Sequence, residues 1–118
     1  MPVLILRTII KRVRAQERDA MRVISKRRLR AFWQRHVAAR SPLEGWFRVV
    51  NDKRLSWSDF HDVKRTYGNA SLVGDCVVFN IGGNKYRLIA WVNYQYGVVY
   101  VRFIGTHRDY DGIDAQNV

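Results

Sequence analysis

The chain has 118 residues, 47% hydrophobic and 13% aromatic, so it is too short for two domains and too apolar to be mostly disordered. Its 21 Lys and Arg against 10 Asp and Glu give a net charge of +11, which favours a polyanionic partner: nucleic acid first, then an anionic membrane surface or an acidic protein. Its one cysteine, Cys76, excludes an internal disulfide framework and a cysteine-rich zinc site, and we expect it to be a small buried residue.

Residues 1–20 are predicted to form a basic N-terminal extension whose apolar residues fall near helical spacing. As a basic amphipathic helix it could bind a membrane or RNA; alternatively, Met21 is the true start and the stretch is an upstream artefact or an optional arm. Its apolar residues precede its basic cluster, the wrong order for a secretory signal, and no apolar run approaches the ~20 residues that span a bilayer. We therefore expect a soluble cytoplasmic protein with no membrane partner, folded as one domain over residues 21–118.

A short strand is predicted at residues 21–24, followed by a helix with Ser25 as its N-cap. The helix is expected to bury an apolar stripe of Leu29, Phe32, Trp33 and Val37. Much of its remaining surface is basic, with Lys26, Arg27, Arg28, Arg30 and Arg35. Such a charge run is usually a solvated face, but no carboxylate pairs these cations, so a phosphate-binding face is a comparable alternative.

Two more helices are expected. The first is predicted to start at Ser41, with Glu44 completing a capping box, and the second to run from Ser56 to a left-handed cap at Gly68. Their aromatic stripes indicate a scaffold packed in the core. The histidines of the helical region are His36 and His61. Neither has a second ligand at metal spacing, so we expect packing or surface roles, and no metal or cofactor.

Residues 77–107 are predicted to form three strands joined by two tight turns. A turn at Gly83 and Asn84 places Asn80 opposite Arg87 on one face and only apolar pairs on the other. A second turn at Tyr96 and Gly97 extends the same alternation to the last strand. The expected core face then comprises Val77, Phe79, Ile81, Tyr86, Leu88, Ala90, Val92, Val101 and Phe103.

The opposite face of this sheet is predicted to be cationic. It carries Asn80, Lys85, Arg87, Trp91 and Arg102. The second turn places Trp91 opposite Arg102 and Arg87 opposite Thr106, so that His107 leaves the last strand directly beside Arg87. Cations with an aromatic side chain among them suit single-stranded RNA, whose phosphates and bases they can bind.

Cleavage of RNA would need few additions to such a face. The ribose 2′-OH attacks the adjacent phosphorus, so a site must hold the phosphate, stabilise negative charge and move two protons. Arg87 suits the first two needs and His107 the proton transfers, with Lys85, Arg102 and Tyr110 in support. On these grounds a sheet that only binds RNA remains the simpler alternative.

Three segments closely resemble the HigB toxins of the RelE-like superfamily: Met21–Ser25, GNKYRLIAWVNY, and VVYVRFIGTHRDYD near the end. The resemblance implies an α+β RelE-like fold, with an N-terminal strand and about three helices packed on one face of an antiparallel sheet. It implies the toxin of a type II toxin–antitoxin system, a metal-independent endoribonuclease that cuts mRNA on the ribosome and so inhibits translation. The implied partner is a cognate helix-turn-helix antitoxin, similar to HigA, through which alone the toxin would meet DNA.

Carried over by position, the resemblance implies active-site roles for Arg87, His107 and Tyr110. Two lysines of RelE correspond here to Val78 and Asn80. Their charge would have to come from Lys85 or from a helix residue such as Lys64, and ribosomal RNA would be held by the basic helix, including Lys26, Arg27 and Arg30. Asp109 and Asp111 either orient His107 or solvate the tail. A non-catalytic RNA-binding module is the alternative function, and a DNA-binding repressor ranks last.

Overall fold

The computed structural model describes residues 21–118, so the predicted extension of residues 1–20 lies outside the described residues. The described part is an α+β fold with a five-stranded mixed sheet and four α-helices. No helix among these residues is long and apolar enough to cross a membrane. In chain order the elements are β1 Arg22–Ile24, α2 Lys26–Arg35, the 3-10 turn η1 Val37–Ala39, α3 Arg40–Val50, α4 Phe60–Thr66, β2 Ser71–Val73, β3 Cys76–Ile81, β4 Tyr86–Asn93, β5 Val98–Thr106, α5 His107–Asp111 and the 3-10 turn η2 Ala115–Asn117.

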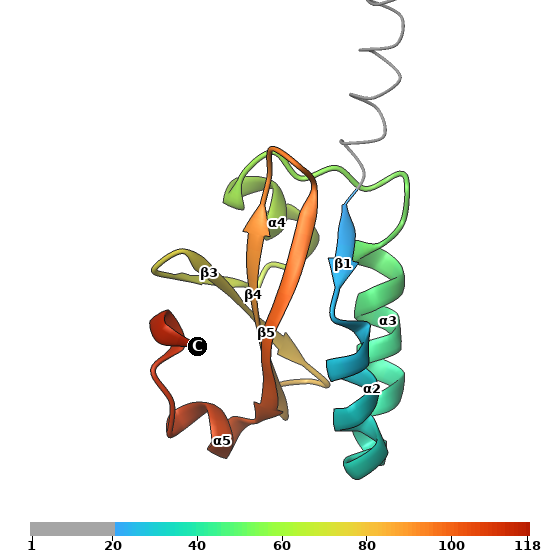
Figure 1. The fold of residues 1–118 in the computed structure, drawn as a ribbon, viewed down its shortest axis with the longest axis vertical. Helices are drawn as coiled ribbons and strands as arrows, with labels where there is room; N and C mark the ends of the chain where they lie inside the picture. The colour runs from blue at the N-terminus through green and yellow to red at the C-terminus, as the bar shows by residue number, and fades with distance from the viewer. Residues whose placement is uncertain (1–20) are drawn as a thin grey trace, which may run out of the picture.

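The strand order in the sheet is β1-β5-β4-β3-β2. The pairs from β2 to β5 are antiparallel, whereas β1 pairs parallel with β5, Arg22 opposite Val98 and Ile24 opposite Tyr100. The prediction of a purely antiparallel sheet is therefore wrong. The two strands are separated by the whole helical region, and a connection of that length permits parallel pairing. Figure 1 shows β1 at the edge of the sheet, with α2 and α3 beside it.

One face of the sheet, here called the helical face, is covered by α2, α3 and α4 and holds the main core. Phe79 lies at its centre, with ring centroids 5.4 Å from Trp46, 6.1 Å from Trp57 and 5.5 Å from Tyr67. The predicted core-face residues found in this core are Val77, Phe79, Ile81, Tyr86, Leu88, Ala90, Val92 and Val101. The prediction is wrong for Phe103, which lies on the opposite face.

The helix boundaries agree with the prediction only in part: α2 starts directly after Ser25 as expected, but it ends at Arg35, before Val37. Ser25 has a positive φ of 81° and its side chain makes no capping hydrogen bond. Ser41 lies inside α3, because that helix starts at Arg40. The Glu44 carboxylate predicted for a capping box instead pairs with Arg40 at 2.8 Å, an i,i+4 ion pair. Val37, expected in the core, is 75% exposed in the 3-10 turn that follows α2.

The third predicted helix is shorter than expected. It starts after Asp59, whose side chain accepts a hydrogen bond from the Asp62 amide at 3.0 Å, so Ser56 is not its cap. Trp57 packs in the core just ahead of the helix. The helix ends at an extended Tyr67, and Gly68 has no positive φ, so the predicted left-handed cap is wrong.

The register between β3 and β4 is as predicted. Phe79 pairs with Leu88, and Asn80 with Arg87. Gly83 and Asn84 form the turn with positive φ values of 61° and 84°. Two successive left-handed residues match the twist of a hairpin, which explains why Gly-Asn identified this turn correctly.

The register between β4 and β5 differs from the prediction. Asn93 pairs with Val98 across a four-residue connection, in which the Asn93 side chain accepts a hydrogen bond from the Tyr96 amide at 3.1 Å. A second shift follows at a β-bulge, where Ala90 pairs with Val101 but Ile89 pairs with Phe103. Arg102 is the extra residue of this bulge, so it does not face Trp91 as predicted.

The other face of the sheet, here called the C-terminal face, is partly covered by the end of the chain. The cluster on this face contains Cys76, Val78, Ile89, Phe103, Tyr110, Ile113 and Ala115. The prediction that the helices pack on one face of the sheet only is therefore wrong, because α5 lies on the C-terminal face. Cys76 is buried as expected, and its burial raises the pKa of its thiol. Val78 is buried here too, so an apolar side chain occupies a position where the resemblance had indicated a lysine.

Candidate active site

His107 is the first residue of α5 and is half-exposed, with 48% of its side chain accessible. A reciprocal capping box fixes the helix start: the Thr106 hydroxyl accepts from the Asp109 amide, and the Asp109 carboxylate accepts from the Thr106 amide, both at 3.1 Å. One turn later, Asp111 Oδ2 lies 3.1 Å from His107 Nδ1. The ring is thus held from one side, and Nε2 has no partner within residues 21–118.

The two aspartates near the histidine have different roles. Asp111 contacts the imidazole, whereas Asp109 serves the helix cap. Hydrogen bonds from the backbone and side chain of Thr106 hold the pKa of Asp109 below its usual value. Of the two residues considered for orienting His107, only Asp111 is therefore placed to do so.

The strand neighbour of His107 is Lys85 rather than Arg87. The His107 amide donates to the Lys85 carbonyl at 3.0 Å, and Arg87 pairs with Gly105. The prediction that His107 lies directly beside Arg87 is wrong by one residue of register. The four-residue connection shifts β5 by two residues against β4, and the bulge moves it back by one. Glycine at position 105 leaves no side chain between Arg87 and α5, and a Cβ there would lie only 3.0 Å from Asp109 Cβ.

Arg87 nevertheless reaches the same end of the sheet. Its Cζ lies 5.9 Å from the centroid of the Tyr110 ring, within the range of a cation–π contact. Its Nη1 donates to the carbonyls of Asn84 at 3.2 Å and Tyr86 at 3.4 Å, which anchors one side of the guanidinium. Its other N–H groups have no partner within the described residues. The turn, the end of β5 and α5 therefore bring Arg87, Tyr110, Lys85 and His107 to one corner of the molecule.

Arg102 lies outside this corner, in a groove between α2 and β5. The cavity there is about 270 Å³ and is lined by Arg28, Ala31, Phe32, Arg35, Arg102, Phe103 and Ile104. Arg28 Nη1 donates to the Arg102 carbonyl at 2.5 Å, in the part of β5 that has run past β1. Arg28 and Arg35 are two helical turns apart and so share one face of α2. The sequence prediction did not separate these two arginines from the other cations of the helix. Their i,i+7 spacing is the one signal in the sequence that places them on the same face of the helix.

The remaining RNA-binding candidates do not gather at this site. Arg27 and Arg30 are exposed on α2, and Lys26 lies over the Phe47 ring at 4.3 Å. Lys64 donates to the Gly68 carbonyl at 2.7 Å, where it caps the end of α4. Figure 1 shows α4 and α5 at opposite ends of the sheet, so Lys64 does not replace the lysines absent at Val78 and Asn80.

The two other histidines are placed as predicted. His36 stacks on Phe32 with ring centroids 4.4 Å apart, a packing role, and His61 is exposed on α4. Among residues 21–118, no three His, Cys, Asp or Glu side chains gather in a way that could hold a metal ion.

Short stretches of known proteins resemble this chain. An mRNA interferase toxin HigB of Escherichia coli strain K12 is 44% identical over 38 residues, as are an mRNA interferase HigB of Escherichia coli O157:H7 and one of Shigella flexneri. Each match covers 32% of this chain and 36% of the relative's length. Over a longer range, residues 39–113 match the family described as HigB toxin, RelE-like toxic component of a toxin-antitoxin system. This chain therefore belongs to the HigB toxin family.

Proposed function

We propose that this protein is the toxin of a type II toxin–antitoxin system and an endoribonuclease that cuts mRNA, thereby inhibiting translation. The observation that carries the proposal is the corner where α5 presents a half-exposed His107, held by Asp111, next to Tyr110 and Arg87. Membership of the HigB family and the names of the relatives support the same assignment. We further infer that the arrangement of the fold is RelE-like and that the protein acts in the cytoplasm.

The proposed reaction is attack of a ribose 2′-oxygen on the neighbouring phosphorus, with departure of the 5′-oxygen of the next nucleotide. One proton leaves the 2′-OH and one is delivered to the 5′-oxygen, so that a 2′,3′-cyclic phosphate and a free 5′-OH result. The chemistry needs a held phosphate and a proton carrier, and it needs no redox step. Arginine, histidine and tyrosine side chains can meet these needs without a metal ion.

His107 is the proposed proton carrier. When Nδ1 donates to Asp111, the tautomer leaves the lone pair of Nε2 free to accept a proton from the 2′-OH. The Asp111 carboxylate also stabilises the imidazolium that forms. Arg87 is the proposed partner of the phosphate, because its free N–H groups suit the negative charge that grows in the transition state. Lys85 and Tyr110 are proposed to support the charge and the position of Arg87.

The substrate strand is proposed to run from this corner along the groove between α2 and β5. Arg28, Arg35 and Arg102 offer three positive charges there, and no carboxylate lines the groove. Phosphates on either side of the cleaved bond would meet these arginines. Arg27 and Arg30, on the exposed side of α2, are proposed to face RNA of the ribosome, on which the mRNA is cut.

The proposed protein partner is a helix-turn-helix antitoxin similar to HigA. A toxin of this kind is active only when its antitoxin is absent, so the pair controls when mRNA is cut. Any contact with DNA would be made by the antitoxin.

The test compares wild type with His107→Gln and Arg87→Gln in cells and on mRNA, free or on ribosomes. Loss of a general acid–base group should lower the cleavage rate about 100-fold or more and abolish growth arrest. Arg87→Gln should lower the cleavage rate with little effect on the amount of folded protein, because Arg87 has no ion pair within residues 21–118. His61→Gln is the matched control, since His61 is exposed on α4.

Two outcomes separate the alternatives. Unchanged cleavage by His107→Gln would remove this residue from the mechanism. Wild-type protein that binds mRNA tightly but leaves it intact, on and off ribosomes, would make the protein a non-catalytic RNA-binding module. Binding of RNA without cleavage would need only the cationic groove between α2 and β5.

A further inference from the structure

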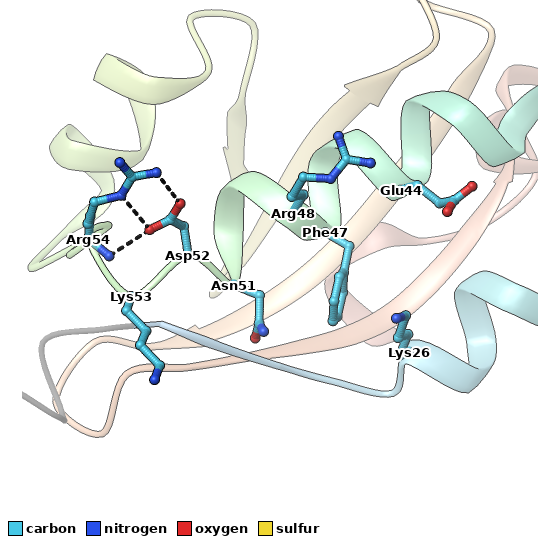
Figure 2. Close-up of a pocket in the computed structure, with 8 residues that line it drawn as sticks. All are labelled: Lys26, Glu44, Phe47, Arg48, Asn51, Asp52, Lys53 and Arg54. Carbon is cyan, nitrogen blue, oxygen red and sulfur yellow. Dashed lines mark hydrogen bonds and ion pairs between the residues drawn. The ribbon is translucent and has the colours of Figure 1, made fainter.

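A cavity of about 660 Å³ lies away from the catalytic corner, between the start of α2 and the end of α3. Figure 2 shows its lining, with Phe47 between Arg48 and Lys26, and with Asn51 and Lys53 to one side. The lining residues are Lys26, Glu44, Phe47, Arg48, Asn51, Asp52, Lys53 and Arg54. This region is called the α2–α3 pocket below.

The charges of the α2–α3 pocket are unequally satisfied. Both carboxylates are already paired: Glu44 with Arg40 at 2.8 Å, and Asp52 with Arg54, whose Nη2 is 2.8 Å from Oδ2. Hydrogen bonds from Arg54 lower the pKa of Asp52 to about 2, so this carboxylate is ionised and its charge is matched. By contrast, neither Arg48 nor Lys53 has an ion pair or a side-chain hydrogen bond within residues 21–118. The pocket therefore carries two positive charges, Arg48 and Lys53, that an anionic ligand could neutralise.

The pocket also has an apolar wall and a fixed amide. Phe47 is half-buried, and Lys26 Nζ lies 4.3 Å from its ring centroid. The Asn51 side chain is held in place because its Oδ1 accepts a hydrogen bond from the Val23 amide at 3.1 Å. The Asn51 NH₂ group is left as a donor. An aromatic wall, a donor and free cations in one hollow suit a nucleotide, which presents a flat base and a phosphate together.

We infer that the α2–α3 pocket is a second RNA-binding site, which takes a nucleotide of an RNA strand away from the bond that is cut. Arg48 and Lys53 bind phosphates, Phe47 packs against a base, and Asn51 donates to it. This inference rests on the proposed function, since it assumes that RNA is the ligand of the protein. It adds a site that acts on affinity and orientation and not on the chemical step.

The distance from the catalytic corner supports that division of roles. Lys26 is the first residue of α2, whose ten residues span about 15 Å at 1.5 Å per residue. The residue after α2 is His36, whose ring lies 6.4 Å from that of Tyr86, and Tyr86 pairs with Thr106 next to His107. The two ends of α2 thus belong to two different sites. A nucleotide in the pocket cannot be the one that reacts at His107.

RNA fits the pocket better than a protein partner does. The apolar side chains that a protein would cover, Val49 and Leu55, line a separate hollow of about 260 Å³ that meets the α2–α3 pocket only at Asp52 and Arg54. The pocket itself presents cations, and the exposed Arg27 next to Lys26 continues the positive surface. A strand with a phosphate at every nucleotide can follow that surface.

The test measures RNA binding by protein in which His107→Gln prevents cleavage. Arg48→Gln and Lys53→Gln are compared with Arg65→Gln, which removes an equal charge from the last turn of α4, where Arg65 lies 3.6 Å from Asp62. Each pocket variant should weaken binding and lower the slope of log K against log salt by about 0.7, the value for one phosphate contact on a single strand. Arg65→Gln should leave the slope unchanged. Unaltered melting temperatures verify that the variants fold.

Two probes distinguish the source of the RNA. Weaker binding to a single-stranded oligonucleotide indicates the substrate strand, and weaker binding to ribosomes without mRNA indicates ribosomal RNA; either result supports the site. Slopes equal to that of the Arg65→Gln variant with both probes would overturn it. So would loss of antitoxin binding with RNA binding intact, because the pocket would then be a protein interface.

The outcome is separable from that of the proposed function. With His107 present, Arg48→Gln should raise the KM for RNA, since the pocket acts on affinity, whereas the control Arg65→Gln should cleave RNA as the wild type does. A failed pocket thus leaves cleavage by the wild type unaffected. Absence of cleavage by the wild type would disprove the proposed nuclease activity, but the RNA-binding measurements would still test the α2–α3 pocket.

Discussion

The two faces of the same sheet are built in different ways. On the helical face, Phe79 is 1% exposed and contacts three other aromatic rings, and three helices cover it. On the C-terminal face the cover is the five-residue α5 and the segment after it, and Phe103 and Tyr110 are only half-buried. The candidate active site lies at the edge of this thinner layer. We infer from this contrast that the helical face supplies most of the stability, whereas the C-terminal face holds the functional groups of the candidate active site.

The largest expected effect tests this division of stability. Phe79→Ala should lower the free energy of unfolding by ~3–5 kcal/mol, because it leaves a large cavity among close-packed rings. Phe103→Ala removes the same ring from the C-terminal face and should cost less, since its ring is already partly in water. Urea unfolding of both variants measures the difference. Equal losses would show that the two faces contribute alike.

A smaller effect is expected where the C-terminal face approaches the active site. A Cβ at position 105 would lie 2.6 Å from Phe103 Cζ and 3.0 Å from Asp109 Cβ. Gly105→Ala should therefore push the Phe103 ring and α5 away, at a cost of ~1–3 kcal/mol in stability. Because α5 carries His107, the cleavage rate should fall as well, by up to about 100-fold for a displacement of about 1 Å.

Gly68→Ala is the control for this substitution. A Cβ at position 68 meets nothing within 4 Å, and the residue has no positive φ, so stability and cleavage should both stay near wild type. Gly105→Ala with wild-type cleavage would show that the position of α5 is not critical. It would also weaken the case that this thin layer sets the active-site geometry.

The sequence predicted the sheet in part, and the physical reason for the failure is specific. Alternation and the Gly-Asn turn gave the correct register of β3 with β4. The same reasoning failed for β5 for two reasons. The connection has four residues instead of two, which shifts the register by two residues and leaves the alternation of faces unchanged, and the bulge at Arg102 then shifts the register back by one. A pattern of period two cannot locate a single inserted residue. The error moved the strand partner of His107 from Arg87 to Lys85.

Local capping signals were similarly incomplete. Ser-Pro-Leu-Glu at residues 41–44 predicted a helix capped by Ser41, but α3 starts at Arg40, and the Glu44 carboxylate pairs with Arg40 instead of closing a capping box. The start of α5 was missed even though Thr106 and Asp109 have the spacing of a capping box. Candidate residues at the site were thus identified by type, whereas their mutual positions depended on packing that the local sequence does not encode.

The smallest expected effect concerns a single phenol on the helical face. Burial raises the pKa of Tyr67 to about 12 from its ordinary value of 10.0. Between these two values the unfolded chain loses a proton that the folded chain keeps, so the free energy of unfolding falls as the pH rises through this window. Below pH 10 the full contribution is present. Tyr67→Phe should remove this part of the pH dependence, so urea unfolding at pH 9 and pH 11 should differ less for the variant than for wild type. An identical loss in both proteins would show that the helical face does not shield Tyr67 from water, and so would weaken its contrast with the C-terminal face.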